Sequence, residues 1–274
     1  MLETKKLLKH AISKVDVILE VLDARLPLSS ANPVLNKLSA DKFCLKVLNK
    51  KDLADPVRTE AWLDYFKKDK NRSVIAVTGS QKEETDAVLK YCTSRIKRNR
   101  ARKIKIMVVG IPNTGKSTIL NTLAGKKIAK TGNVPAVTRH QQRTSLNNNI
   151  DIYDTPGILW PVIEPARRAS ILAASGAISD TAIDYTDIAF FSARFLIASY
   201  PGLLMHRYDF LNSMPDDALV LIEQIGAARG CLKKGGIVNI QKASELFIRE
   251  LRAGKIGPIS FETPEDIDDD TKTQ

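Results

Sequence analysis

The stretch Gly110-Ile-Pro-Asn-Thr-Gly-Lys-Ser117 decides the fold of this chain. Its two glycines are separated by four residues and followed by a Lys-Ser pair, which is the pattern of a phosphate-binding loop. The apolar run Ile104–Val109 precedes the loop and a helical pattern over residues 117–123 follows it. Small residues let successive backbone N–H groups converge on a phosphate at the positive end of a helix. The sequence therefore predicts a nucleotide site between a buried strand and a helix.

A second motif, Asn49-Lys-Lys-Asp52, lies upstream of the phosphate-binding loop and directly after the apolar run 43–48. It has the form of the motif by which GTPases read guanine. The Asp52 carboxylate can accept hydrogen bonds from guanine N1–H and N2–H₂, a donor pair that adenine lacks. We expect Asn49 to bond the base and brace the phosphate-binding loop, and the Lys50 stem to cover the ring. In most GTPases this motif lies downstream, so its position here predicts a circularly permuted fold.

Three further segments complete the predicted site. Thr78 and Gly79 end the apolar run Ser73–Val77 and fit a backbone contact to guanine O6. Asp154-Thr-Pro-Gly157 follows another strand pattern, so Asp154 is expected to hold Mg²⁺ through water and the Gly157 N–H to sense the γ-phosphate. Thr138 lies between these motifs and is the candidate threonine that ligates Mg²⁺ in the triphosphate state.

Within the loop, Lys116 is expected to reach the β- and γ-phosphate oxygens and the Ser117 hydroxyl to bind Mg²⁺. The predicted nucleotide contacts are Asn49, Lys50, Asp52, Thr78, Gly79, Gly110, Pro112, Asn113, Thr114, Gly115, Lys116, Ser117, Thr118 and Gly157.

The residue after Gly157 is Ile158, where many GTPases carry a glutamine that orients the attacking water. An apolar side chain cannot do this, so unaided hydrolysis is expected to be slow. The Asn113 amide oxygen could hold a monovalent cation against the phosphates, or Asn113 could simply be a turn-forming residue. The catalytic candidates are thus Lys116, Thr138, Gly157 and Asn113.

The order of elements predicts an α/β domain followed by a smaller all-α domain. The apolar runs at 15–21, 43–48, 73–77 and 104–109 alternate with helical or loop stretches, which indicates a mostly parallel sheet with helices on both faces. Residues 141–146 and 150–153 flank three asparagines and predict a β-hairpin at the sheet edge. We expect a permuted GTPase domain over 1–164, with a basic interlobe segment at about 95–103. A helical domain over 165–262 and an acidic, disordered tail over 263–274 complete the prediction.

The composition indicates which kinds of partner and which cellular compartment suit the chain. The chain of 274 residues carries a formal net charge of +11, which favours a polyanion, either nucleic acid or an acidic membrane surface. Its three cysteines are far apart, which predicts neither a disulfide framework nor a zinc site and suits a reducing cytoplasm. The most apolar stretch, 188–204, is interrupted by Arg194 and Pro201, so we expect no membrane span, and no secretory leader is expected at the start. Nothing demands a dimer, and we expect a monomer.

The phrases that connect these motifs resemble the ribosome biogenesis GTPase A (YlqF/RbgA-type) family of circularly permuted GTPases. They are Asp23-Ala-Arg-Leu-Pro27, Gly110-Ile-Pro-Asn113, Asp154-Thr-Pro-Gly-Ile-Leu-Trp-Pro161 and Arg229-Gly-Cys-Leu-Lys-Lys-Gly-Gly236, and the resemblance covers nearly the whole chain. It implies a GTPase that binds the large ribosomal subunit during late assembly. The expected cofactors are GTP or GDP and Mg²⁺, and we expect no DNA or membrane partner. The resemblance also implies K⁺-stimulated hydrolysis with Asn113 as the K⁺ ligand, and a C-terminal helical domain that contacts ribosomal RNA.

Two features depart from that family. Its members usually begin with a Pro-Gly-His-Met phrase whose histidine is proposed to assist hydrolysis, and this sequence begins at the methionine. Either the start is assigned too late or other groups replace the histidine. The usual valine of the phosphate-binding loop is Thr114 here. The alternative function is therefore a nucleotide-gated RNA-binding switch with negligible hydrolysis of its own.

The helical domain carries a set of basic candidates for RNA contact: Arg229, Lys233, Lys234, Lys242, Arg249, Arg252 and Lys255. On the predicted helix 241–252 the apolar residues Ala243, Leu246, Phe247 and Leu251 form one stripe and the basic residues another face. This face could bind RNA phosphates with salt-sensitive affinity, or it could be solvated only. The same two readings, RNA contact or charged linker, stay open for the basic residues 95–105.

Overall fold

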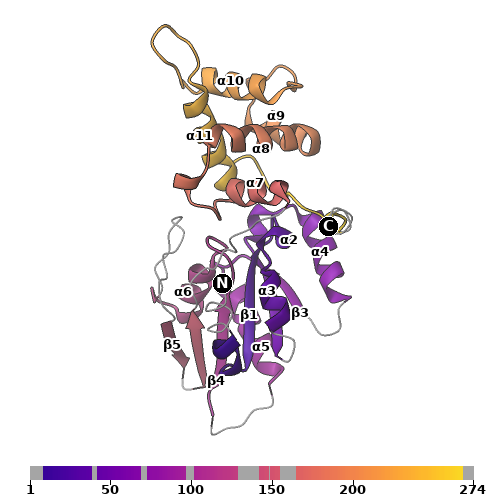
Figure 1. The fold of residues 1–274 in the computed structure, drawn as a ribbon, viewed down its shortest axis with the longest axis vertical. Helices are drawn as coiled ribbons and strands as arrows, with labels where there is room; N and C mark the ends of the chain where they lie inside the picture. The colour runs from indigo at the N-terminus through magenta and orange to yellow at the C-terminus, as the bar shows by residue number, and fades with distance from the viewer. Residues whose placement is uncertain are drawn as a thin grey trace. The chain divides into compact units, whose positions relative to one another are not determined.

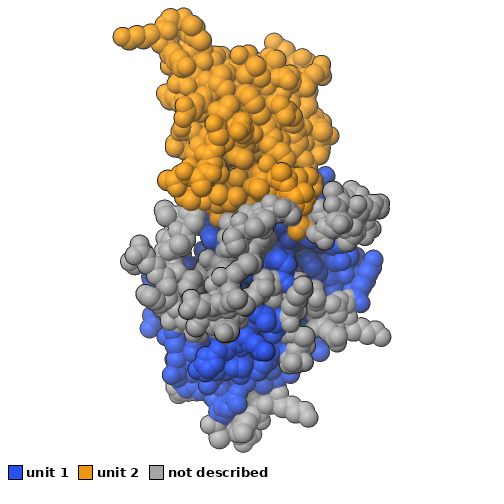
Figure 2. Space-filling model, in the orientation of Figure 1, with its two compact units in different colours: residues 1–162, 262–274 blue, residues 163–261 orange. Residues whose placement is uncertain are grey.

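The computed structural model describes residues 9–38, 42–68, 73–96, 102–128, 142–147, 149–154 and 165–267. It divides into two compact units, residues 1–162 with 262–274 and residues 163–261 (Figure 2). The predicted site residues Thr138 and Gly157, with Ile158, lie outside the described residues.

The described elements of the first unit begin with a helical segment at residues 9–13. They continue with β1 (Val17–Asp23), α2 (Pro27–Ser30), α3 (Pro33–Leu38), β2 (Phe43–Asn49), the 3₁₀ helix η1 (Lys51–Leu53), α4 (Pro56–Lys67), β3 (Ser73–Val77), α5 (Lys82–Ser94), β4 (Ile104–Val109), α6 (Lys116–Ala124), β5 (Gln142–Asn147) and β6 (Ile150–Asp154) (Figure 1).

These strands form one sheet in the order β3-β2-β1-β4-β6-β5. All neighbouring pairs are parallel except the β5–β6 hairpin, which lies at one edge of the described sheet. Helices α5 and α6 pack on one face through Val88 and Ile119, and α3 and α4 pack on the other through Leu35 and Trp62. The predicted mostly parallel sheet with helices on both faces, and the predicted hairpin, are confirmed.

The strand bounds follow the sequence patterns closely; β5 begins and ends one residue later than predicted, and the larger shift is that of β1. The run predicted from residue 15 begins as β1 at Val17, because Val15 packs beside Ile12 in the turn before the strand. The carboxyl ends of β1, β2, β3, β4 and β6 lie at one edge of the sheet, since these strands are parallel, and loops at that edge are where α/β proteins bind ligands. All the predicted nucleotide motifs of the described chain lie there.

The second unit is helical in the part that the structure describes. Its elements are α7 (Ala166–Ser175), the 3₁₀ helix η2 (Asp180–Ala182), α8 (Tyr185–Ser199), α9 (Pro201–Arg207), α10 (Ala218–Ala228) and α11 (Ile240–Arg252), with one isolated bridge between Leu232 and Val238. Asp184, Asp217 and Asn239 accept backbone N–H bonds at the starts of α8, α10 and α11, so each of these helices begins at a side-chain cap. Within the described residues no single helix meets the length and hydropathy of a membrane span; α8 and α9 do so only together, across a bend of 110°.

The C-terminal boundary differs from the predicted one. The segment from Glu262 belongs to the first unit, whereas the sequence predicted a helical domain up to residue 262 and a disordered tail beyond it. The buried Glu262 carboxylate accepts the backbone N–H groups of Leu28 and Ser29, and Ile267 packs against the cluster that contains Trp62. Glu262 was predicted to end the helical domain, and the acidic composition that predicted a tail from residue 263 gave no sign that Ile267 packs on the first unit. Residues 268–274 lie outside the described part.

Candidate nucleotide site

The phosphate-binding loop joins β4 to α6, as predicted. Gly115 has φ +89°, and a Cβ there would lie 2.2 Å from Nδ2 of Asn49. Gly110 has φ +153°, and a Cβ there would lie 2.4 Å from the Val21 carbonyl oxygen. Only glycine satisfies both the backbone angles and these close approaches.

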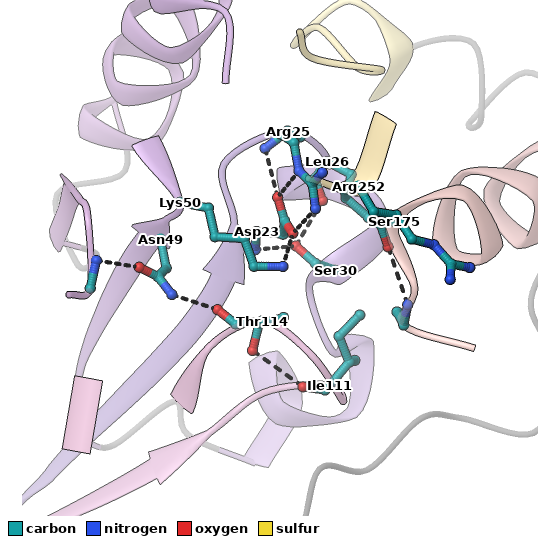
Figure 3. A network of polar contacts seen from close by, with 12 residues as sticks. Asp23, Arg25, Leu26, Ser30, Asn49, Lys50, Ile111, Thr114, Ser175 and Arg252 are labelled. Carbon is teal, nitrogen blue, oxygen red and sulfur yellow. Dashed lines mark hydrogen bonds and ion pairs between the residues drawn. The ribbon is translucent and has the colours of Figure 1, made fainter. Parts of the chain in front are cut away.

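Asn49, the last residue of β2, joins three predicted segments of the site (Figure 3). Its Nδ2 donates to the Thr114 carbonyl oxygen at 2.7 Å, and its Oδ1 accepts the Gly79 backbone N–H at 2.9 Å. The side chain is buried, with 2% of the residue exposed. The guanine motif, the phosphate-binding loop and the loop after β3 are therefore held together by one amide group.

Lys116 begins α6 and its ammonium lies inside the loop. The Nζ donates to the Ile111 carbonyl oxygen at 2.7 Å. Burial lowers the pKa of Lys116 to about 8, although the negative charge of Asp154 opposes the shift; the positive charge of Lys50 adds to it. A buried ammonium inside this loop is suited to the oxygens of a polyphosphate.

Two described residues suit a magnesium ion beside that polyphosphate. Asp154 ends β6, next to β4, and is buried, while Ser117 is half-buried in the first turn of α6. Mg²⁺ is commonly held by one or two carboxylates together with substrate phosphates and water. Among the described residues no group of three or more His, Cys, Asp or Glu could hold a metal. The hydroxyl and carboxylate therefore fit a Mg²⁺ whose coordination the nucleotide completes.

The guanine motif continues from Asn49 into η1. Lys50 turns the chain with φ 62°, and Asp52 lies exposed in the 3₁₀ helix. Lys51 pairs with Glu84 at 2.8 Å, and the other Glu84 oxygen accepts the Thr78 backbone N–H at 2.7 Å. Burial opposes the charge of Glu84, but these bonds lower its pKa. Sequence reasoning missed Glu84, whose only local signal is an acidic residue in the first turn of α5.

Asp23 is a second residue that sequence reasoning left without a role. Its Oδ2 accepts Lys50 Nζ at 2.8 Å, and its two oxygens accept Nε and Nη2 of Arg25 at 3.0 and 2.9 Å (Figure 3). Burial would raise the pKa of Asp23, but Arg25 and Lys50 hold it well below its ordinary value. The sequence predicted only that the aliphatic stem of Lys50 covers the base. The structure shows that its ammonium is held by an ion pair with Asp23. An acidic residue at the end of a strand adjacent to the guanine motif was the available signal.

In the second unit most of the basic candidates are exposed: Arg229, Lys233, Lys234, Lys242, Arg249 and Lys255. Arg252 differs, because its Nε and Nη2 donate to the carbonyl oxygens of Ala174 and Ala173 at the end of α7, and its Nη1 pairs with Asp180 at 2.8 Å. These bonds hold the Arg252 guanidinium within its own unit, and its contact with RNA stays a prediction.

A parallel sheet that carries a phosphate-binding loop and a guanine motif at its carboxyl edge defines a P-loop GTPase. Residues 105–204 match the family model described as 50S ribosome-binding GTPase. Ribosome biogenesis GTPase A of Bacillus cereus is 40% identical to the chain, covering 97% of this chain and 93% of that protein. The Thermotoga maritima protein of the same name is 34% identical, covering 97% and 92%. The chain belongs to the ribosome biogenesis GTPase A family, and it is a GTPase of ribosome biogenesis.

Solved structures agree with this assignment. GNP-bound YlqF from T. maritima matches with a TM-score of 0.69 at 32% identity, covering 96% of this chain and 99% of that one. GDP-bound TM YlqF matches with a TM-score of 0.68 at 30% identity, covering 95% and 100%. The two-unit architecture is therefore that of a known fold.

Proposed function

We propose that this protein is a circularly permuted GTPase that binds and hydrolyses GTP in late assembly of the large ribosomal subunit, and that its nucleotide state controls its binding to ribosomal RNA. The description of the matched family model as ribosome-binding and the net charge of +11 support a ribosomal partner. The order of the guanine motif and the phosphate-binding loop along the chain, with the strand order β3-β2-β1-β4-β6-β5, supports the permutation. The bacterial relatives support a cytoplasmic location, and we propose a monomer.

The observation that carries the proposal is the double hydrogen bond of Asn49. It holds the phosphate-binding loop at Thr114 and the loop after β3 at Gly79, so residues suited to the phosphates and residues suited to guanine lie at the same edge of the sheet. A chance match to either motif would not explain why the Asn49 side chain bonds the backbone of both loops.

The roles follow from the chemistry of each residue. Asp52 reads guanine N1–H and N2–H₂, with Thr78 and Gly79 beside O6, and Lys116 binds the β- and γ-phosphates. Ser117 and Thr138 would ligate Mg²⁺ and Asp154 would hold it through water, and the ion would neutralise charge on the phosphates. The Gly157 N–H contacts the γ-phosphate. Because the segment with Asp154 and Gly157 leads along the chain into the second unit, ordering it by GTP could reorient the RNA-binding helices.

Asn113 is the proposed K⁺ ligand. It is half-buried in the loop with φ 60°, a conformation that few non-glycine residues adopt outside tight turns. A monovalent cation there would add positive charge near the β- and γ-phosphates, in a site where Ile158 cannot orient water. Removal of this cation should therefore lower the rate of GTP hydrolysis more than it lowers the affinity for GDP.

The exposed basic residues of the second unit are the proposed RNA contacts. Lys242 and Arg249 lie on α11, and Lys233 and Lys234 lie in the turn between Leu232 and Val238. Phosphate contacts of this kind give an affinity that falls steeply with salt.

The test is GTP turnover in potassium and in sodium buffer, with and without purified large ribosomal subunits. We expect subunits and potassium each to stimulate turnover. Binding to subunits in the presence of a GTP analogue, without any stimulation, would favour the RNA-binding switch with negligible hydrolysis. No binding in either nucleotide state would overturn the ribosomal assignment.

A further inference from the structure

We propose that Asp23 is a positioning residue for guanine recognition: it holds Arg25 and Lys50 away from Asp52, so that the carboxylate of Asp52 stays free to read the base. The inference rests on the guanine-binding role proposed above for Asp52.

The sheet brings these residues together. Asp23 ends β1 in register with Asn49, the last residue of β2, and Lys50 and Asp52 follow directly. The backbone of Asp23 is fixed as well, because its N–H donates to Ser30 Oγ at 3.1 Å. Asp23 is therefore a rigid point on the strand adjacent to the guanine motif.

The Asp23 carboxylate is saturated by donors. Oδ1 accepts Arg25 Nε at 3.0 Å and the Arg25 backbone N–H at 3.1 Å. Oδ2 accepts Arg25 Nη2 at 2.9 Å and Lys50 Nζ at 2.8 Å. Asp23 and Arg25 are each 2% exposed. A bidentate, buried Arg–carboxylate pair has a fixed geometry, and the second oxygen is thereby aimed at Lys50.

Both cations lie close enough to Asp52 to interact with its charge. Burial opposes the charge of Arg25, yet the pKa of Arg25 is raised by Asp23 and, to a smaller extent, by Asp52. Burial lowers the pKa of Lys50, and Asp23 and Asp52 again counteract this. Even so, no cation among the described residues forms an ion pair with Asp52, and its carboxylate is exposed.

The charges explain why Asp23 is needed. One carboxylate, one guanidinium and one ammonium leave a net charge of +1 at this point of the site. If Asp23 were neutral, the buried Arg25 and the half-buried Lys50 would lose their partner, and Asp52 is the other carboxylate whose charge acts on both of them. A cation paired with Asp52 would compete with guanine N1–H and N2–H₂ for the same oxygens. Asp23 thus keeps the Lys50 ammonium from forming an ion pair with Asp52 of the same motif.

The experiment compares GDP with inosine diphosphate, which lacks the 2-amino group, in equilibrium titrations of the full chain. The wild-type protein should prefer GDP by about tenfold or more, since one hydrogen bond to a carboxylate distinguishes the two ligands. Asp23→Asn should weaken GDP binding and reduce the preference to about threefold or less, because Asp52 no longer acts as a free acceptor. A purely structural role would weaken both nucleotides equally and leave their ratio unchanged.

Further variants make the test specific. Adding Lys50→Met to Asp23→Asn should restore part of the preference for GDP, because it removes a competing cation. If Asp23→Asn does not fold, the double variant Asp23→Asn with Arg25→Gln replaces it, because it removes one charge of each sign. Lys50 has no ion-pair partner in this variant either, so the variant should also lose the preference for GDP over inosine diphosphate. Asp16→Asn is the matched control, since Asp16 pairs with Arg102 just before β1, away from the site.

The outcomes separate this proposal from the one on which it depends. If the wild-type protein does not prefer GDP to ADP, the guanine site itself is wrong. If the wild type does prefer GDP, and the Asp23 variants discriminate GDP from inosine diphosphate as well as the wild type does, then Asp23 has no positioning role.

Discussion

Replacing Gly79 with alanine tests the junction between the guanine motif and the phosphate-binding loop. A Cβ at Gly79 would lie 2.6 Å from Asn49 Oδ1 and 2.8 Å from Ile119 Cγ1. Both distances are shorter than atoms tolerate, and both neighbours are buried. The new methyl group must therefore displace the Asn49 amide, which also holds the Thr114 carbonyl.

The magnitude follows from these contacts. Overpacking of a buried site costs about 1–3 kcal/mol. Losing the hydrogen bond between the Gly79 N–H and Asn49 adds about 1 kcal/mol. In the nucleotide-free protein the loop can shift, and we take about half of this cost to be relieved there. The other half, about 1–2 kcal/mol, then weakens the binding of GDP, which corresponds to roughly a five- to thirtyfold rise in the Kd.

The assay is titration of a fluorescent GDP analogue together with urea denaturation in its absence. Gly202→Ala is the matched control, because Gly202 lies in α9 and a Cβ there meets nothing within 4 Å. We expect this control to bind as the wild type does. Wild-type affinity in Gly79→Ala would refute the bracing role of Asn49.

Three further predictions concern buried charges. Burial favours the neutral form of Lys116 above its pKa of about 8, whereas bound phosphate oxygens favour the protonated form. GDP binding above this pH should therefore take up a proton, and the affinity for GDP should fall as the pH rises through that value. Calorimetry in buffers of different ionisation enthalpy should detect this proton uptake. If no proton is taken up above this pH, Lys116 is not protonated by GDP binding. Burial raises the pKa of Glu262 from 4.5 to about 7, so the native state binds a proton more tightly than the unfolded chain does, and the free energy of unfolding should fall as pH rises across that interval. Glu262→Gln should flatten this dependence in denaturation curves, whereas an unchanged slope would assign it to other groups. Lys46→Met should destabilise the protein by about 3–5 kcal/mol, because it leaves the buried Glu20 without its ion pair. The double variant with Glu20→Gln should recover most of this loss, and a failure to do so would mean that packing matters more than charge.

Much of the fold was predictable because its signals are local. The runs at Ser73–Val77 and Ile104–Val109 coincide with β3 and β4, since a short apolar run between helical or loop stretches favours a buried strand. The loop from Gly110 to Ser117 was predictable as well, because its glycines encode positive φ angles at Gly110 and Gly115.

The errors in the prediction concern contacts between distant segments. Glu262 and Ile267 were assigned to the end of the helical domain and to the acidic tail, but they pack on the first unit. The sequence also gave no sign that the Arg252 guanidinium donates to carbonyl oxygens of α7. In each case the residue type gave the polarity of the side chain and could not give its partner.

The sequence by itself determined the strands, the phosphate-binding loop, the guanine motif and their order along the chain, because each depends on neighbouring residues. Only the tertiary structure decided that Asn49 joins Thr114 to Gly79 and that Asp23 holds Lys50. These contacts arise where parallel strands from separate parts of the chain end side by side. The pairing of those ends is set by the register and packing of the whole sheet, which no local pattern specifies.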